Sequence, residues 1–135
     1  MALLNILGKI FGNKYDKDVK NIIPIVKQIN DKYSSFSSLN NDQLRSKTQE
    51  LKNKISEYIK IDKEEISSLK QKAESDIIAE EKEALYDEID KKEVVVIEKL
   101  EEVLSEILPT AFAIVKETAR RFTENKKIEV TATEF

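Results

Sequence analysis

The chain contains neither glycine nor proline between Pro24 and Pro109. Glycine and proline are the residue types that interrupt helices most strongly. Such a long span without either of them favours long, continuous helices. Apolar residues make up 40% of the chain and charged residues 36%. This balance is too apolar for a disordered segment and too charged for a compact globule. We therefore expect an all-α fold with long, solvated helices.

Two apolar stripes run through this span at helical spacing. Each stripe covers 29 residues in eight steps, about 3.6 residues per step, which is the period of a straight helix. The first stripe is Leu44, Thr48, Leu51, Ile55, Ile59, Asp62, Ile66, Leu69 and Ala73, and the second is Ile78, Lys82, Leu85, Ile89, Lys92, Val96, Leu100, Val103 and Ile107. Equal stripes predict a long antiparallel helical hairpin over about 41–73 and 78–107. Because no glycine marks the turn, a single helix from about Asp62 onward is the alternative.

Shorter elements are expected on both sides of the hairpin. An earlier helix has Pro24 inside it, where a kink or a late start is expected. Its apolar positions are Val19, Ile22, Val26, Ile29 and Tyr33. The Ser-rich residues 34–38 predict a loop, and Asn40 is placed to cap the next helix.

Pro109 is expected to end the hairpin and to lie in the first turn of one further helix. That helix is predicted to bury Phe112, Val115, Ala119 and Phe122, with Arg120 and Arg121 complementing its dipole. Residues 127–135 alternate apolar and polar side chains, which predicts an incomplete β-strand. A single strand cannot satisfy its own edges, so the natural polypeptide is expected to continue.

The first eleven residues are mostly apolar, with Asn5 and Lys9 on one polar stripe of a short helix that Gly12 would end. One interpretation is an interfacial helix that lies on a membrane or on a membrane partner. The alternative is a segment that packs on its own protein or on a second copy. The candidate membrane- or partner-binding residues are Leu3, Leu4, Ile6, Leu7, Lys9, Ile10 and Phe11.

The residue inventory argues against catalysis. The chain has no cysteine and no histidine, which excludes disulfides, thiolate zinc sites and imidazole-based nucleophile activation. Neither a phosphate loop nor an EF-hand pattern is present, and the many carboxylates between Glu57 and Glu106 are typical of a solvated helical face. We predict no catalytic, cofactor-binding or metal-binding residues. The excess of basic residues over 1–56 has few interleaved aromatics, so nucleic acid is not expected as a partner.

Three stretches resemble the SecA family of ATPases, which drive preproteins through the SecY channel. They are residues 9–12 (KIFG), residues 39–48 (LNNDQLRSKT), similar to the family's Leu-Ser-Asp-Glu-Glu-Leu-x-x-Lys-Thr, and residues 108–117 (LPTAFAIVKE), similar to its Ile-Pro-Glu-Ala-Phe-Ala-Val-Val-Arg-Glu. Their order is the family's, and with the intervening sequence they cover roughly two thirds of the chain.

The resemblance implies an N-terminal helical region of a larger motor. Residues 1–12 would contact an anionic membrane surface and a SecY-type channel, and residues 16–59 and 102–125 would brace the remainder of the ATPase domains. Residues 60–101 would be an inserted hairpin, and 127–135 the start of the nucleotide-binding domain. The parent would use ATP and Mg²⁺ in the cytoplasm, peripherally associated with the inner face of the cell membrane. The family's nucleotide-binding motifs lie beyond residue 117, so none of their residues maps onto this chain.

Two other functions are weighed against this one. A self-contained acidic coiled-coil adaptor or oligomerisation module would form a stable oligomer, for example a homodimer, that is lost when Leu69, Leu85 and Leu100 become polar. A complete small enzyme is disfavoured by the residue inventory.

Overall fold

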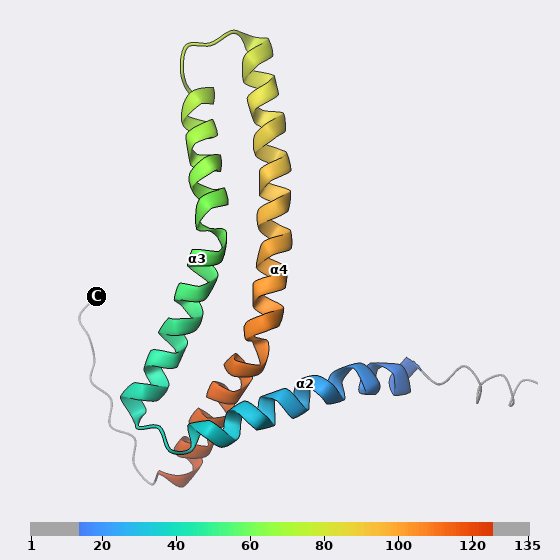
Figure 1. Ribbon diagram of the computed structural model, residues 1–135, viewed down its shortest axis with the longest axis vertical. Coiled ribbons are helices and arrows are strands. Elements are labelled where there is room, and N and C mark those ends of the chain that lie inside the picture. Colours follow the sequence, from blue (N-terminus) through green and yellow to red (C-terminus); the bar gives the residue numbers. More distant parts are fainter. Residues whose placement is uncertain (1–13, 126–135) are drawn as a thin grey trace, which may run out of the picture. The chain divides into compact units, whose positions relative to one another are not determined.

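The computed structural model describes residues 14–125, which form three helices (Figure 1). Helix α2 spans Lys14–Phe36, α3 spans Asn41–Ala73 and α4 spans Ala79–Glu124. The predicted all-α class is confirmed for this part of the chain. The predicted helix over 1–12 and the predicted strand over 127–135 lie outside the described residues. The chain divides into two compact units, residues 41–108 and residues 1–40 together with 109–135.

The first unit consists of α3 and the first thirty residues of α4, which run antiparallel (Figure 1). Five polar pairs join the two helices. The first four fix this direction, because the α4 partner moves back from Glu106 to Lys92 as the α3 partner advances from Lys54 to Glu65. The pairs are Lys54 with Glu106, Tyr58 with Glu102, Asp62 with Lys99, Glu65 with Lys92 and Lys70 with Glu93. The helical run ends at Ala73 and resumes at Ala79, which excludes the single long helix.

The two predicted stripes face each other inside this unit. Buried side chains from both helices form one cluster: Ile59, Ile66, Leu69, Ile89 and Val96, with Ile55, Leu85 and Leu100 packed against it. Of the eighteen stripe positions, only Thr48 and Ile78 are exposed. Of the charged members, Asp62 and Lys92 each have an ion-pair partner on the opposite helix, Lys99 and Glu65 respectively. A hydrogen bond from Lys99, 2.6 Å from Asp62, holds the pKa of this carboxyl below its usual value.

Helix α4 continues through Pro109 to Glu124, so the prediction of one further helix after Pro109 is wrong. Proline inside a helix removes one backbone hydrogen bond and costs roughly 3 kcal/mol. The buried side chains of Ile107 and Ala113 lie on either side of it, and Pro109 itself is buried. Burial over consecutive turns offsets the lost hydrogen bond, which the sequence rule for proline does not take into account.

Helix α2 includes Pro24 and extends three residues into the predicted serine loop. The hydroxyl groups of Ser34 and Ser35 donate to the carbonyl oxygens of Asp31 and Lys32, each at 2.7 Å. Serine can satisfy its own side chain in this way within a helix, so it does not have to end one. The helix ends at the buried Phe36, and α3 begins directly after Asn40, the predicted cap.

Candidate functional site

The second unit exposes large apolar side chains on both of its helices. On α4, Phe112, Val115 and Phe122 are each more than half exposed, at 57%, 65% and 57%. On α2, the exposed apolar residues are Tyr15, Ile22, Ile23, Ile25 and Val26. The prediction that Phe112, Val115, Ala119 and Phe122 are buried is therefore wrong for this chain, because the structure turns this stripe toward solvent. Neighbouring exposed apolar groups of this size are typical of a binding surface.

A different face of α4 packs within the unit. Ala113, Ile114 and Glu117 are buried, at spacings that place them on one side of the helix. On the adjoining side, Lys116 donates to the side chain of Asn30 at 2.8 Å, and its ammonium lies 4.3 Å from the ring centre of Tyr33. Both contacts are with α2. The contact between α2 and the end of α4 is thus partly polar, and the most apolar stripe of α4 is left outside it.

Glu117 is the centre of a buried charge network that the sequence analysis missed. Its carboxylate accepts from Arg120 at 2.7 and 2.9 Å and from Arg121 at 2.7 Å. The hydrogen bond from Arg120, helped by that from Arg121, outweighs desolvation and lowers the pKa of Glu117 to about 2. The spacing Glu-x-x-Arg-Arg, in which both arginines can reach back one turn, is the signal in the sequence that indicates such a network.

Arg121 extends this network to the backbone after α2. Its guanidinium donates to the carbonyl oxygen of Leu39 at 2.6 Å and to that of Phe36 at 3.3 Å. These carbonyls lie at and just beyond the end of α2, where backbone acceptors have no partner inside the helix. The predicted dipole role of Arg121 is thus accompanied by a structural one, because its side chain holds residues 36–39 against the end of α4.

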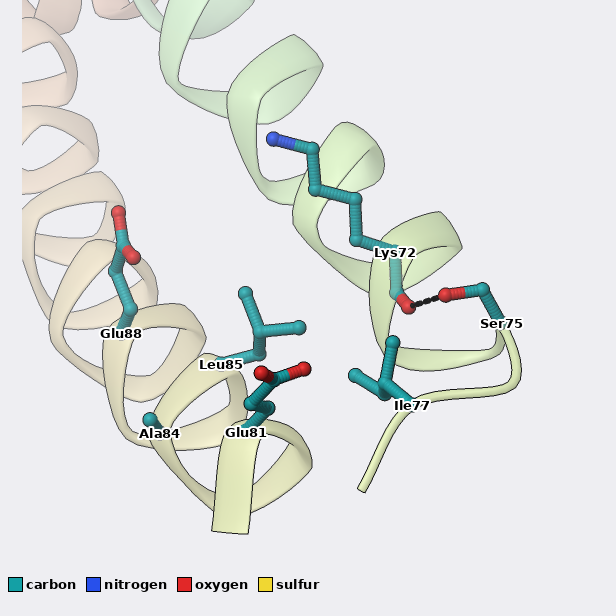
Figure 2. A pocket seen from close by; sticks show the side chains of 7 residues that line it. All are labelled: Lys72, Ser75, Ile77, Glu81, Ala84, Leu85 and Glu88. Atoms are coloured by element: carbon teal, nitrogen blue, oxygen red, sulfur yellow. Dashed lines mark hydrogen bonds between the residues drawn. The ribbon is translucent and has the colours of Figure 1, made fainter. Parts of the chain in front are cut away.

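A cavity of about 410 Å³ lies at the tip of the first unit, between the end of α3 and the start of α4 (Figure 2). Its lining residues are Lys72, Ser75, Ile77, Glu81, Ala84, Leu85 and Glu88. Figure 2 shows Ile77 and Leu85 projecting into the space between the helices. The Ser75 hydroxyl donates to the Lys72 carbonyl at 2.6 Å, and five of the seven residues are exposed. The site is open to solvent, and its half-buried side chains, Ile77 and Leu85, offer apolar contact.

Neither a metal site nor a membrane span is found in the part of the chain that the structure describes. No group of three or more Asp or Glu residues there is arranged to hold a metal ion. None of the three helices has an apolar stretch long enough to cross a bilayer. The predicted membrane- or partner-binding residues lie before residue 14, outside the described residues, so that prediction stays untested.

Comparison with known proteins decides the family. The family profile of the SecA DEAD-like domain matches residues 7–133. The chain belongs to the SecA family. The SecA proteins of Parabacteroides distasonis and Azobacteroides pseudotrichonymphae, each a protein translocase subunit, are 42% and 47% identical to it over all 135 residues. That of Chloroherpeton thalassium is 45% identical over 120 residues, or 88% of the chain. No solved structure matches the chain significantly.

The extent of these SecA matches adds two facts. The chain spans only 12% of the length of each of these relatives. The alignments with the first two relatives cover the whole chain, so they include residues 60–101. Residues 60–101, which the sequence analysis interprets as an insertion, are therefore aligned in these relatives as well.

Proposed function

We propose that this chain is the N-terminal helical scaffold of a SecA-type motor, and that the remainder of the same polypeptide covers its exposed apolar surfaces. The observation that carries the proposal is the outward stripe of Phe112, Val115 and Phe122. It lies within the family match, in a chain that spans only 12% of the length of its relatives. Neighbouring exposed apolar side chains of this size are typical of a surface that another surface covers.

The parent protein, in this proposal, drives protein export through a SecY-type channel at the cytoplasmic face of the cell membrane, using ATP and Mg²⁺. Support comes from the relatives, which are named as protein translocase subunits. The present stretch supplies positioning and no catalysis, since its sequence has no phosphate loop and no histidine or cysteine. Residues 1–12 would add contact with anionic lipid and with the channel.

Cysteine labelling tests whether the apolar stripe is covered. The chain has no cysteine, so Phe112→Cys introduces a single thiol at a position that is 57% exposed. We expect a maleimide to modify this thiol rapidly in the 135-residue chain and at least about tenfold more slowly in the full-length protein freed of its other cysteines, because a covered thiol reacts only after local opening.

Ile61→Cys is the matched control. Ile61 is 69% exposed and lies on α3 in the other unit. Its thiol should react at similar rates in both proteins. Equal rates at position 112 in the short and the long protein would contradict the proposed scaffold.

A further inference from the structure

The two flanks of the first unit differ in the number of polar pairs that join α3 to α4. Lys92 and Glu93 are neighbours on α4, so their side chains point about 100° apart. Lys92 bonds to Glu65 and Glu93 bonds to Lys70, each at 2.7 Å, so the two pairs lie on opposite flanks. The flank of Lys92 also holds three further cross-helix pairs, which involve Lys99, Glu102 and Glu106. The flank of Glu93 has one cross-helix ion pair among the described residues.

We call the flank of the Lys70–Glu93 pair the open flank, and it carries an exposed apolar row on α4. The row consists of Tyr86, Ile97 and Leu104. Tyr86 comes seven residues before Glu93 in the sequence, Ile97 four residues after it and Leu104 eleven residues after it. At about 100° per residue, all three lie within about 40° of its direction. Their exposed fractions are 49%, 57% and 49%, so nothing in the described chain covers them.

Rows of opposite charge border the apolar row. On α3, a basic row on the same flank consists of Lys52, Lys63 and Lys70. Lys63 lies seven residues, or two helical turns, before Lys70, and Lys52 lies eighteen residues, or five turns, before it. Beyond the apolar row, farther from α3, Asp90 and Glu101 form an acidic row on α4. The side chains of both charged rows, three lysines and two carboxylates, are all exposed. Across the open flank the order is therefore basic, apolar, acidic.

This order makes the open flank complementary to itself. A two-fold axis that runs along the apolar row sets this row against its counterpart in a second, parallel copy, and it brings each basic row against an acidic row. The charges of the two rows also lie at matching heights along the hairpin. Lys70 pairs with Glu93, which is one helical turn from Asp90. Lys63 follows Asp62, whose partner Lys99 is within one turn of Glu101. An antiparallel arrangement would set lysines against lysines.

We propose that the open flank binds the open flank of a second copy of this chain, which forms a parallel two-fold dimer through the hairpin. The basic, apolar and acidic order carries this choice of partner. The proposal does not depend on the motor function. It also changes which residues test association, since Leu69, Leu85 and Leu100 belong to the hairpin's own core and their replacement would unfold it.

Disulfide trapping in the cysteine-free chain tests the geometry. In a parallel two-fold dimer, every residue of the apolar row faces its own counterpart. Tyr86→Cys, Ile97→Cys and Leu104→Cys, each made singly, should therefore all give disulfide-linked dimers under mild oxidation. Val95→Cys is the matched control, since Val95 is 40% exposed and stands seven residues before Glu102, on the opposite flank. It should stay largely uncrosslinked. Trapping at one position of the row only, or equal trapping at Val95, would overturn the proposal.

Measurement of the molecular mass in solution, together with substitutions that reverse charges on the open flank, completes the test. Light scattering should give the full chain a mass that rises with concentration toward twice 15.6 kDa. The double variant Ile97→Glu with Leu104→Glu should stay at the monomer mass with unchanged helical circular dichroism. Lys63→Glu should weaken the dimer, and adding Glu101→Lys should restore it. A monomeric parent chain, which would leave the flank to an acidic helix or a lipid surface, would overturn the proposal, as would a dimer that survives the double variant.

Discussion

The substitution Glu117→Gln removes a buried negative charge and changes the side-chain volume little. In the native unit this carboxylate accepts hydrogen bonds from Arg120 and Arg121 while it is fully screened from solvent. The amide that replaces it can still accept from one arginine, but both arginines lose the carboxylate that they share, and Arg120 keeps its exposed ion pair with Glu124. We therefore expect a clear loss of stability in the unit formed by α2 and residues 109–125.

The magnitude follows from the pKa of Glu117, which the unit lowers from 4.5 to about 2. One pKa unit corresponds to about 1.4 kcal/mol, so the surroundings favour the ionised form by roughly 3 kcal/mol. Since glutamine retains part of the hydrogen bonding, we expect the free energy of unfolding to fall by about 2–3 kcal/mol at pH 7.

The pH dependence has a defined sign. A depressed carboxyl pKa stabilises the folded state fully at pH values above the unfolded pKa, and this contribution is lost as the pH falls through the folded value. The difference between the parent chain and Glu117→Gln should therefore be constant from pH 7 to about 5. It should shrink steadily between pH 4.5 and about 2.

Urea unfolding followed by circular dichroism at several pH values measures the difference, and amide hydrogen exchange in residues 109–125 assigns it to this unit. The control is Glu102→Gln, which removes an exposed carboxylate that accepts from Tyr58 at 2.7 Å. Exposed polar pairs contribute little, so the control should lose less than about 1 kcal/mol. A loss below 1 kcal/mol in Glu117→Gln, or the same loss at pH 3 and pH 7, would refute the reasoning.

Two further predictions concern the hairpin core and the N-terminus. Ile59→Ala should destabilise the hairpin by roughly 2–5 kcal/mol in urea unfolding, because Ile59 is only 3% exposed, whereas Ile61→Ala, at a position that is 69% exposed, should change stability by less than about 0.5 kcal/mol. Equal losses would show that the core is misplaced. In co-sedimentation with vesicles of anionic lipid, the chain should bind more strongly than a variant lacking residues 2–11, and equal binding by both would rule out the interfacial helix.

The sequence predicted the hairpin core well because both halves of that core lie in the same chain. Each stripe, considered by itself, contains charged residues in an apolar row, among them Asp62 in the first and Lys92 in the second. The structure gives these two residues a partner each on the opposite helix. Helical periodicity predicts such an arrangement, because it fixes which positions share a face whether or not each side chain is apolar.

The same rule failed after Pro109 because periodicity finds an apolar face but not its partner. The stripe containing Phe112, Val115 and Phe122 is the most apolar face of this segment, so it was predicted to be the core. In the structure the segment packs on α2 with the face of Ala113 and Glu117 instead. A buried glutamate is recognised only when its arginine partners and its burial are known together, and the sequence shows only the spacing.

The two units therefore reach stability by different means. The hairpin encloses its own apolar seam and lines one flank with cross-helix pairs, so it needs no other part of the protein to bury its core. The unit formed by α2 and the end of α4 encloses a carboxylate with two arginines, and it turns its largest apolar side chains outward. A buried charge network adds little net stability over apolar packing, although removal of one of its members is costly. A unit that depends on such a network while its apolar faces remain uncovered is suited to docking against a larger body, which is the role proposed here for the beginning of a SecA motor.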